Sequence, residues 1–426
     1  MRIAIVGTGI SGLTCAHLLD PAHDVTVFEA GSWVGGHTNT VDVELPAPDG
    51  TVERHAVDTG FIVFNERNYP NFVTLLDRLG VASQPSEMSF SVRNERTGLE
   101  YRGTNLNTLY AQRANALRPS FTRMLLDIVR FNRRARRLVT EGADLDLSLE
   151  QFIEQGGYSQ RFRDDFLVPL GASIWSADPE TFLRFPAEAY CRFMGNHGLL
   201  ELRGLPTWRT VTGGSRRYVE ALTARLRRPV RTETPVGKLV RRSDPSRPFG
   251  AALELVTPDG PESFDAVVLA CHSDQSLELL GDPSRVEREV LGAIRYQYNL
   301  ATLHTDSRLL PREPRARASW NYHLGAGSGR EATLTYWMNN LQRIESSHDL
   351  LVTLNRPGEI DPSTVLAEFG YDHPVFDAAA MAAQRRRAEV QGARGTFFAG
   401  AYWGYGFHED GVSSALDVCR HFGVGL

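Results

Sequence analysis

Lysine is almost missing from this chain of 426 residues, because Lys238 is the only one and arginine supplies all the other strongly basic side chains. The formal net charge is −5 and the sequence pI is about 6.2, so the composition gives no general attraction to nucleic acid. No apolar stretch approaches the roughly 20 residues that a transmembrane helix needs. These absences argue against a nucleic-acid-binding protein and against a membrane-spanning one.

Cysteine is scarce as well. The four cysteines, at positions 15, 191, 271 and 419, form no CxxC pair and show no spacing typical of a metal site. We therefore expect reduced, mostly structural cysteines and no bound metal. The first strand-like segment begins at Met1, which leaves no room for a signal peptide, so we expect a cytoplasmic protein.

What the chain does have is a glycine-rich turn in a specific setting. Strand, turn, helix and strand patterns follow one another over residues 1–6, 7–12, 13–19 and 24–28. The glycines of such a turn let a pyrophosphate approach the N-terminus of the helix, whose amides and dipole favour negative charge. Glu29 follows Gly12 by 17 positions, where a carboxylate can accept hydrogen bonds from ribose hydroxyls. This pattern predicts a dinucleotide site rather than an ordinary βαβ unit.

A second glycine pair decides which dinucleotide we expect. Gly35-Gly36-His37-Thr38-Asn39-Thr40 resembles the Gly-Gly-Arg-x-x-Thr pattern of the flavin-dependent amine oxidase superfamily, with its phytoene-desaturase-like and protoporphyrinogen-oxidase-like enzymes. The resemblance implies FAD. His37 stands where the family has arginine, and a neutral imidazole is a poorer phosphate clamp than a guanidinium.

Later segments agree in family order. Val236 and residues 265–271 resemble the middle FAD segment on the adenine side, and residues 396–416 resemble the last strand and helix, whose N-terminus points at the flavin pyrimidine oxygen. The loop at residues 58–61 resembles one that touches the flavin. The resemblance assigns the cofactor contacts to Gly7, Gly9, Ile10, Ser11, Gly12, Glu29, Ala30, Gly35, Gly36, His37, Thr38, Thr59, Gly60, Phe61, Val236, Ala270, Cys271, Gly400, Ala401, Gly411 and Val412.

The same resemblance implies non-covalent FAD, because no His or Cys stands where relatives attach it. It implies an α/β fold in which a Rossmann-type, glutathione-reductase-like FAD-binding domain is interleaved with a mixed-sheet and helical substrate domain. We assign the FAD-binding domain to residues 1–65, 208–275 and 390–426. Residues 66–207 form a mainly helical substrate or cap region, and residues 276–389 form the sheet region of the substrate domain.

A narrower resemblance bears on the substrate. A group of bacterial FAD-dependent, amine-oxidase-like oxidoreductases, associated with cyclopropane-fatty-acid-synthase-like methyltransferases, is similar to this chain at Ile174-Trp-Ser176, Phe185-Pro186 and residues 192–200, 208–218 and 400–411. Relatives of that group act on methylated fatty acyl chains. The resemblance therefore implies an apolar, lipid-like substrate, and a lipid-modifying methyltransferase as a protein partner.

The candidate catalytic residues are His197 and three residues of the loop before the last helix, Trp403, Tyr405 and His408. Aromatic rings between glycines suit a wall beside the isoalloxazine ring, and histidine relays protons near neutral pH. The alternatives are a packed aromatic loop and structural histidines. Many amine oxidases of the superfamily place a lysine beside flavin N5, but Lys238 follows the adenine-side segment, so we expect that arrangement to be absent.

Arginines follow one face of the amphipathic stretch at residues 120–141: they are Arg123, Arg130, Arg134 and Arg137. A basic amphipathic helix can lie on an anionic membrane surface, so we expect peripheral contact with the inner membrane face. The alternative is an ordinary solvated helix face.

These observations predict an FAD-dependent oxidoreductase that transfers hydride from an apolar, fatty-acyl-like substrate to flavin N5. Three alternatives stay open. One is an amine oxidase acting on a C–N bond, another is a redox-neutral isomerase of a double bond, and the third is a non-catalytic flavin-binding partner of a lipid methyltransferase.

Overall fold

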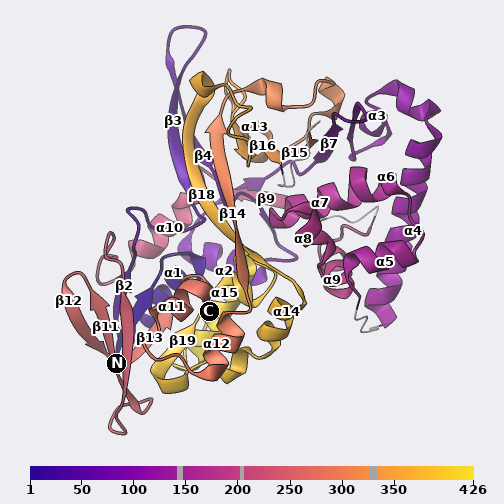
Figure 1. Ribbon diagram of the computed structural model, residues 1–426. Coiled ribbons are helices and arrows are strands. Elements are labelled where there is room, and N and C mark those ends of the chain that lie inside the picture. Colours follow the sequence, from indigo (N-terminus) through magenta and orange to yellow (C-terminus); the bar gives the residue numbers. More distant parts are fainter. Residues whose placement is uncertain (142–146, 202–205, 326–332) are drawn as a thin grey trace.

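A four-stranded parallel sheet holds the glycine-rich turn. The computed structural model describes residues 1–141, 147–201, 206–325 and 333–426. The sheet has the order β19-β13-β1-β2 and lies in the lower part of Figure 1; its strands are β1 (Arg2–Val6), β2 (Asp24–Phe28), β13 (Ala266–Leu269) and β19 (Thr396–Phe398). Each of the three segments predicted to bind FAD contributes a strand, so the sheet unites residues that lie far apart in the sequence.

The two faces of this sheet have different covers, as the alternation of side chains along a strand requires. Ile3 and Ile5 of β1 point into one apolar cluster, and Ala4 and Val6 into another. The first cluster is covered by α1 (Ile10–Leu19), α2 (Pro70–Leu79), α10 (Arg216–Thr223) and α15 (His408–Arg420). The second is covered by β10 (Lys238–Ser243), β11 (Ala251–Thr257), β12 (Gly260–Phe264), α11 (Ser273–Leu279), α12 (Arg285–Leu291) and α14 (Ala378–Arg385).

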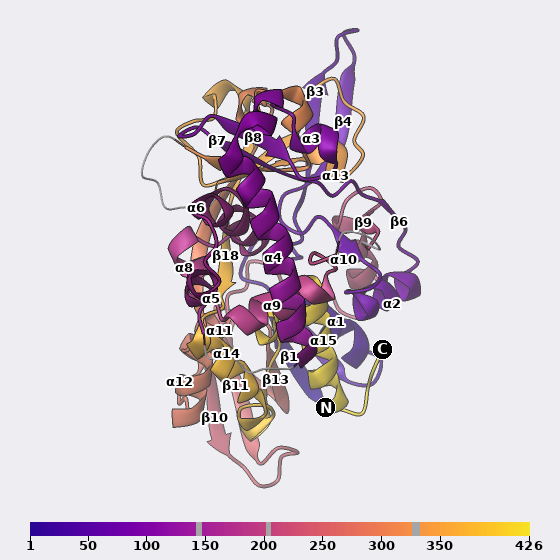
Figure 2. The same ribbon diagram turned by 90° about the vertical axis from the view of Figure 1, so that its right-hand side faces the viewer.

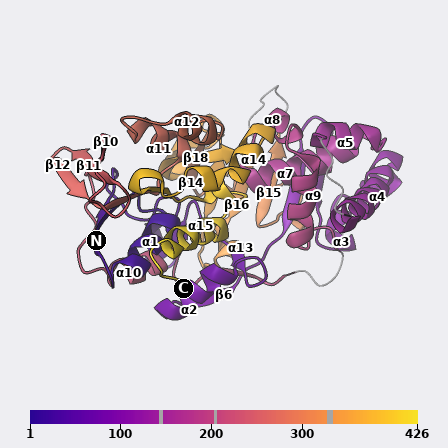
Figure 3. The ribbon, with the colours of Figure 1, turned by 90° about the horizontal axis from the view of Figure 1, so that it is seen from below.

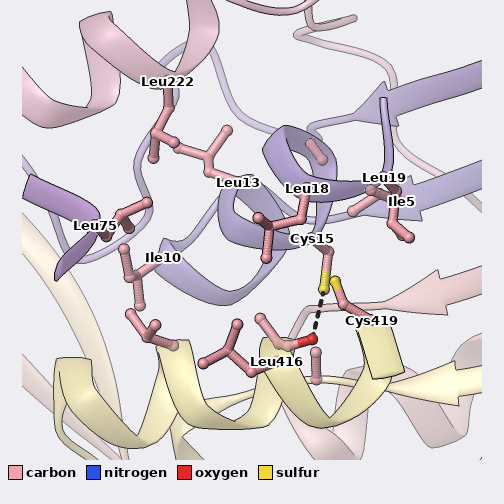
Figure 4. Close-up of a cluster of buried hydrophobic side chains, with 14 of the residues drawn as sticks. Ile5, Ile10, Leu13, Cys15, Leu18, Leu19, Leu75, Leu222, Leu416 and Cys419 are labelled. Carbon is pink, nitrogen blue, oxygen red and sulfur yellow. Dashed lines mark hydrogen bonds between the residues drawn. The ribbon is translucent and has the colours of Figure 1, made fainter. Parts of the chain in front are cut away.

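The crossing of α1 and α15 joins the beginning of the chain to its end (Figure 4). Cys15 and Cys419 are both fully buried there, and the Cys15 thiol lies 3.8 Å from the Ala415 carbonyl oxygen. Gly411 allows the close approach, because a Cβ at this position would lie 2.6 Å from Cγ2 of Ile10. The two helix N-termini are thereby brought side by side.

A seven-stranded mixed sheet forms the second unit. Its order is β18-β14-β17-β16-β15-β7-β8, with β18 (Val365–Val375), β14 (Arg295–His304), β17 (Leu351–Leu354), β16 (Leu334–Trp337), β15 (Trp320–Leu324), β7 (Phe90–Asn94) and β8 (Leu99–Arg102). The long antiparallel pair β14 and β18 runs from the four-stranded sheet to the top of the molecule (Figure 1). Strands β7 and β8 come from residues 66–207, and the other five strands come from residues 276–389. Both predicted substrate regions therefore contribute to one sheet.

Two smaller sheets connect these units. One pairs β3 (Thr40–Pro46) with β4 (Val52–Asp58), and the other has the order β5-β9-β6, with β5 (Phe64–Asn65), β6 (Ser83–Pro85) and β9 (Trp208–Val211). The short helix α13 (Met338–Leu341) lies against the seven-stranded sheet.

The helical region packs against one end of the mixed sheet. Its helices are α3 (Leu106–Leu109), α4 (Pro119–Glu141), α5 (Leu149–Gln155), α6 (Gln160–Phe162), α7 (Val168–Trp175), α8 (Pro179–Leu183) and α9 (Ala187–Asn196). The helix predicted over residues 120–141 is confirmed as α4, which buries Phe121, Met124 and Phe131. Figure 3 shows α4 and α5 at the opposite end of the molecule from β10 to β12. Among the described helices, none has the length and apolar character needed to cross a membrane.

One helix differs from the division that the sequence suggested. Helix α2 falls within the predicted helical region of residues 66–207, but Phe72, Leu75 and Leu76 pack with α1, α10 and α15 and not with that region. Periodicity marks an apolar face without naming its partner, which is why the sequence placed α2 with residues 66–207. The boundaries of the three predicted regions otherwise stay a prediction.

Candidate active site

A cavity of about 950 Å³ lies between the two units. We call its two parts the glycine-rich half and the aromatic half. The glycine-rich half is lined by residues from the ranges 6–37, 234–279, 372–373 and 400–402, and the aromatic half by residues from 62–63, 86–90, 170–176, 193–208, 320 and 336. Residues 60–61 and 406–408 lie between them.

The glycine-rich turn borders the cavity with backbone. Gly7 has φ +103°, and a Cβ at Gly12 would lie 2.0 Å from the Gly7 carbonyl oxygen, so this turn requires glycine at both positions. Helix α1 begins after Gly9 without a side-chain cap. Its first amides therefore lack a side-chain acceptor, and a Cβ at Gly9 would have no protein atom within 4 Å. This cradle suits an anion that approaches a helix N-terminus.

Glu29 is held at the edge of the cradle. One carboxylate oxygen accepts from the Gly31 amide at 2.8 Å, and the other accepts from the Thr8 amide at 3.1 Å and from the Thr8 hydroxyl. The carboxylate thus lines the cavity in a fixed orientation, at the end of β2.

His408, which the sequence placed in the loop before the last helix, is the first residue of α15 and is held between the two halves by several contacts. Its Nε2 lies 3.0 Å from the Thr38 hydroxyl and 2.9 Å from the Tyr218 hydroxyl, and its ring stacks on Phe61 with 3.4 Å between the ring centroids. Burial lowers the pKa of His408 to about 3. The imidazole is therefore neutral and oriented at neutral pH.

The loop that carries Gly60 and Phe61 is tied down by Asp58. Its carboxylate accepts from the Ser215 amide at 2.9 Å and the Gln342 side-chain amide at 3.0 Å, among other donors. Burial raises the pKa of Asp58 to about 6. Gly60 approaches the backbone so closely that a Cβ would lie 2.2 Å from the carbonyl oxygen of His37. The sequence placed Asp58 and Tyr218 in segments that resemble the family but gave neither residue a role, because their partners come from distant segments.

The aromatic half is carbon-rich. It is lined by Phe90, Leu170, Ile174, Phe193, Trp320 and Tyr336, among others. Among its described lining residues, none is an aspartate, glutamate, lysine or arginine. His197 is its one histidine in the described ranges; Nδ1 lies 2.9 Å from the Phe193 carbonyl oxygen, the ring stacks on Phe193, and burial lowers the pKa to about 4.

The sequence profile of the flavin containing amine oxidoreductases matches residues 10–319. The chain belongs to this family. A member of this family carries a flavin, and this chain is a flavin-dependent oxidoreductase. No curated protein sequence matches it.

Solved structures confirm the fold of this flavoenzyme. A CLA-producing fatty acid isomerase from P. acnes is 17% identical with a TM-score of 0.68, covering 99% of this chain and 98% of that chain. Cyclohexylamine oxidase from Brevibacterium oxydans is 16% identical with a TM-score of 0.68, and 99% of each chain is covered. A putative protoporphyrinogen oxidase from Exiguobacterium sp. is 16% identical with a TM-score of 0.66, covering 99% and 98%. At these identities the likeness shows the fold alone.

The residues of the glycine-rich half fit a flavin dinucleotide. The cradle at Gly9 suits a pyrophosphate, and Glu29 suits a ribose. The Tyr402 hydroxyl is buried at the cavity wall with no hydrogen-bond partner among the described residues, so it suits a polar group of the cofactor.

Most of the residues predicted to contact the cofactor line the cavity. They are Gly7, Gly9, Ile10, Ser11, Glu29, Ala30, Gly35, Gly36, His37, Gly60, Phe61, Val236, Ala270, Cys271, Gly400 and Ala401. The other five do not line it: they are Gly12, Thr38, Thr59, Gly411 and Val412. Two of them contact residues near the site. The Thr38 hydroxyl hydrogen-bonds to His408, and the Thr59 hydroxyl lies 2.7 Å from the Tyr371 hydroxyl.

Of the four catalytic candidates, the structure brings His197 and His408 to the cavity but not Trp403 or Tyr405. The Trp403 indole donates to the Phe398 carbonyl oxygen at 3.1 Å, behind β19. Tyr405 packs with the helical region. Neither Trp403 nor Tyr405 is thus among the residues that line the cavity, and their catalytic role stays a prediction. Tyr402 and Phe407 line the cavity instead, because the turn at Ala401–Trp403 rotates successive side chains to different sides.

The only lysine lies outside the site. Lys238 is exposed at the start of β10 and does not line the cavity. No lysine is therefore available beside the flavin. Within the described ranges, the structure also shows no group of His, Cys, Asp or Glu side chains arranged to hold a metal ion.

Proposed function

We propose that this flavoenzyme uses FAD, bound non-covalently, to oxidise an uncharged, apolar substrate of the fatty-acyl type. The observation that carries the proposal is the lining of the aromatic half, which shows no charged side chain in its described part. An acyl chain gains about 0.8 kcal/mol for each methylene buried in such a surface. A cationic amine placed there would lose its hydration without gaining a carboxylate partner, which costs several kcal/mol.

When bound, FAD would supply the two-electron acceptor for a hydride from a substrate C–H bond. The residues of the chain do the rest. The α1 amides would hold the FAD pyrophosphate, and the dipole of α15 would stabilise negative charge near its first residue, His408. Phe193, Ile174 and Tyr336 would exclude water and orient the acyl chain of the substrate against the flavin face.

His408 and His197 fit a positioning role better than the role of a general base. His408 and His197 both have pKa values far below neutrality because they are buried. At neutral pH each ring therefore acts as a hydrogen-bonding group that positions its neighbours. Among the similar folds, one is named a fatty acid isomerase and another an amine oxidase, so the cavity lining, and not the fold, favours the lipid.

Anaerobic mixing separates the candidate functions. Methyl linoleate and methyl oleate in detergent micelles serve as lipid probes, and cyclohexylamine and putrescine as amine probes. Lasting loss of flavin absorbance with the lipids supports oxidation. Transient loss with a rearranged product identifies the isomerase, and a response to amines alone overturns the lipid assignment. No spectral response to any probe would favour a non-catalytic partner of a lipid-modifying methyltransferase.

We also propose that the outer surface of α4 contacts anionic lipid. Three of the four arginines expected to form that surface have other partners: Arg123 and Arg130 pair with buried Asp127, and Arg134 lies 3.9 Å over the Phe152 ring. The solvent-facing side instead carries Leu126, 57% exposed, and Val129, 47% exposed. Arg133 and Arg137 follow them at helical spacing. Both arginines are exposed, and neither has an ion-pair partner among the described residues.

Exposed apolar side chains concentrate in this region. Of ten large apolar side chains that are exposed in the described chain, four fall within residues 106–129, and they include Leu106 at 75% and Leu117 at 88%. Figure 2 shows α3 and α4 on the face turned to the viewer. Arg136 of α4 pairs at 2.9 Å with Glu201, two residues after the cavity-lining Leu199. The surface thus adjoins the aromatic half, where a bilayer lipid would enter.

Vesicle sedimentation tests this contact. The enzyme should bind phosphatidylglycerol vesicles at low salt, bind phosphatidylcholine vesicles far less, and dissociate as salt screens the charges. Leu126→Ser with Val129→Ser, and separately Arg133→Gln with Arg137→Gln, should weaken binding about tenfold and leave flavin bound. Arg242→Gln with Arg285→Gln, at the other end of the molecule, is the matched control. Equal binding by all variants would refute the surface.

A further inference from the structure

Three imidazoles from three separate segments meet in the glycine-rich half. His37 follows the glycine pair, His272 follows β13, and His373 lies in β18. The His37 ring centroid lies 5.2 Å from that of His373 and 6.2 Å from that of His272. All three line the cavity. We call them the histidine cluster.

The cluster is next to the pyrophosphate cradle. A Cβ at Gly36 would lie 3.2 Å from the Cα of Gly9, so His37 begins one residue away from the turn that precedes α1. Among the described residues that line the whole cavity, none is an arginine or a lysine. Histidines are therefore the only side chains in that lining able to carry positive charge toward a dianionic pyrophosphate.

The neighbours hold the rings in place. His373 Nδ1 lies 3.0 Å from the Asn299 side-chain amide, so it acts as the acceptor, and the His37 ring centroid lies 5.0 Å from that of Tyr371. His272 stacks on Tyr296 with 4.4 Å between the ring centroids. Rings fixed in this way are oriented before a ligand arrives, which reduces the entropy lost on binding.

We propose that the histidine cluster is a titratable phosphate-binding site, which replaces the arginine of the Gly-Gly-Arg pattern and makes FAD binding tighter as the pH falls. The inference rests on FAD as the cofactor. One protonated imidazole near the pyrophosphate supplies the charge that a guanidinium would carry permanently. Binding of FAD then takes up protons, so the dissociation constant rises as the pH increases.

The histidines are hard to protonate without the ligand, so their charge depends on whether a pyrophosphate is bound. Burial and the positive charge of the other imidazoles lower the pKa of His37, and burial lowers the pKa of His373 to about 4. A nearby dianion opposes both effects and raises these pKa values. For each proton taken up, the dissociation constant should increase by as much as tenfold per pH unit between the free and the bound pKa.

Other charged groups surround the cluster. Asp372 adjoins His373 on β18, Asp274 and Glu278 lie on α11, Glu29 lies at the end of β2, and His408 begins α15. The titratable hydroxyls and thiol nearby are those of Tyr371, Tyr296 and Cys271. The carboxylates repel a pyrophosphate, which increases the need for a counter-charge from imidazole. Since they do not change with a substitution in the cluster, variants isolate the contribution of the histidines.

Titration of apoprotein with FAD between pH 5.5 and 8.5 tests the proposal. The wild-type dissociation constant should rise at least tenfold from pH 6 to pH 8. His37→Arg should bind more tightly at pH 8 and have a flatter profile, whereas His373→Gln should flatten the profile by weakening binding at pH 6. His348→Gln, outside the cavity lining, is the matched control. A flat wild-type profile, or variants that shift binding equally at every pH, would overturn the proposal.

Two measurements need no variant. Calorimetry at pH 7 in buffers of different ionisation enthalpy should show proton uptake when FAD binds, and none when riboflavin, which has no pyrophosphate, binds. Zero uptake with FAD would also refute the cluster. If the protein binds no FAD at any pH, the assignment of the cofactor fails instead, so the two failures are distinguishable.

Discussion

In the glycine-rich half of the cavity, histidines, carboxylates and backbone amides face the interior, whereas in the aromatic half the described lining is carbon surface with hydroxyls and one neutral histidine. The first set of groups can bind an anion and orient sugar hydroxyls. The second can exclude water and hold a chain of methylenes. Two different ligands, one charged and one apolar, therefore suit the two ends of one cavity.

The comparison shows where specificity resides in this fold. The solved structures with a similar fold include an isomerase of fatty acids and an oxidase of a cyclic amine, although the overall architecture is shared. One fold thus occurs in proteins named for different reactions, so the fold alone does not decide the reaction. In this enzyme the segments that line the aromatic half contribute no charge in their described part.

The largest effect is expected at the cradle. In Gly9→Ala the added methyl lies at the proposed pyrophosphate site and meets no protein atom within 4 Å. We expect FAD content to fall at least tenfold, or about 1.4 kcal/mol in binding, while the apoprotein keeps its circular dichroism. Gly358→Ala, which also meets no atom within 4 Å, should retain FAD. Full occupancy in Gly9→Ala would remove the glycine-rich half as the cofactor site.

A charged side chain placed in the aromatic half should remove the apolar lining that distinguishes it from the glycine-rich half. Ile174→Glu introduces a carboxylate into the apolar lining, and its desolvation costs several kcal/mol. We expect the spectral response to long-chain methyl esters to weaken about a hundredfold while FAD stays bound. Ile174→Leu keeps the volume and should respond normally. Unchanged ester binding in Ile174→Glu would show that the chain lies elsewhere.

The stability of the protein should fall as the pH decreases, because the buried His197 of the aromatic half resists protonation. The folded-state pKa of His197 is about 4, below the ordinary value of 6.5, so the unfolded chain takes the proton first as the pH falls. Its contribution to stability is therefore lost progressively below pH 6.5. His197→Phe should reduce the loss of stability between pH 7.5 and 5.5 by about 1 kcal/mol. Thermal unfolding at the two pH values measures this; an equal loss would contradict it.

The smallest effect is expected at the only lysine. Lys238 is exposed and lies outside the cavity lining, so Lys238→Gln should change the rate of flavin reduction by less than a few-fold, under about 1 kcal/mol of barrier. Anaerobic stopped-flow with the best lipid probe provides the measurement. A hundredfold decrease with FAD still bound would restore the lysine-dependent amine oxidase mechanism.

Much of the glycine-rich half could be predicted from the sequence. The turn at Gly7 to Gly12, the carboxylate at Glu29 and the pair at Gly35 and Gly36 are each a contiguous motif whose backbone geometry is set by neighbouring residues. The aromatic wall could not be predicted, because a residue's side in the turn at 401–403 depends on how that turn packs. As a result Trp403 was predicted where Tyr402 stands.

By itself, the sequence predicted a dinucleotide site at a helix N-terminus and placed the single lysine just after the segment that resembles the adenine-side segment of the family. Both depend on local spacing, which fixes local geometry. Only the tertiary structure decided that His37, His272 and His373 meet, that α2 packs with α15, and that the aromatic half shows no charge in its described lining. Those contacts join residues up to several hundred positions apart, and the packing of sheets and helices, which no local pattern encodes, brings them together.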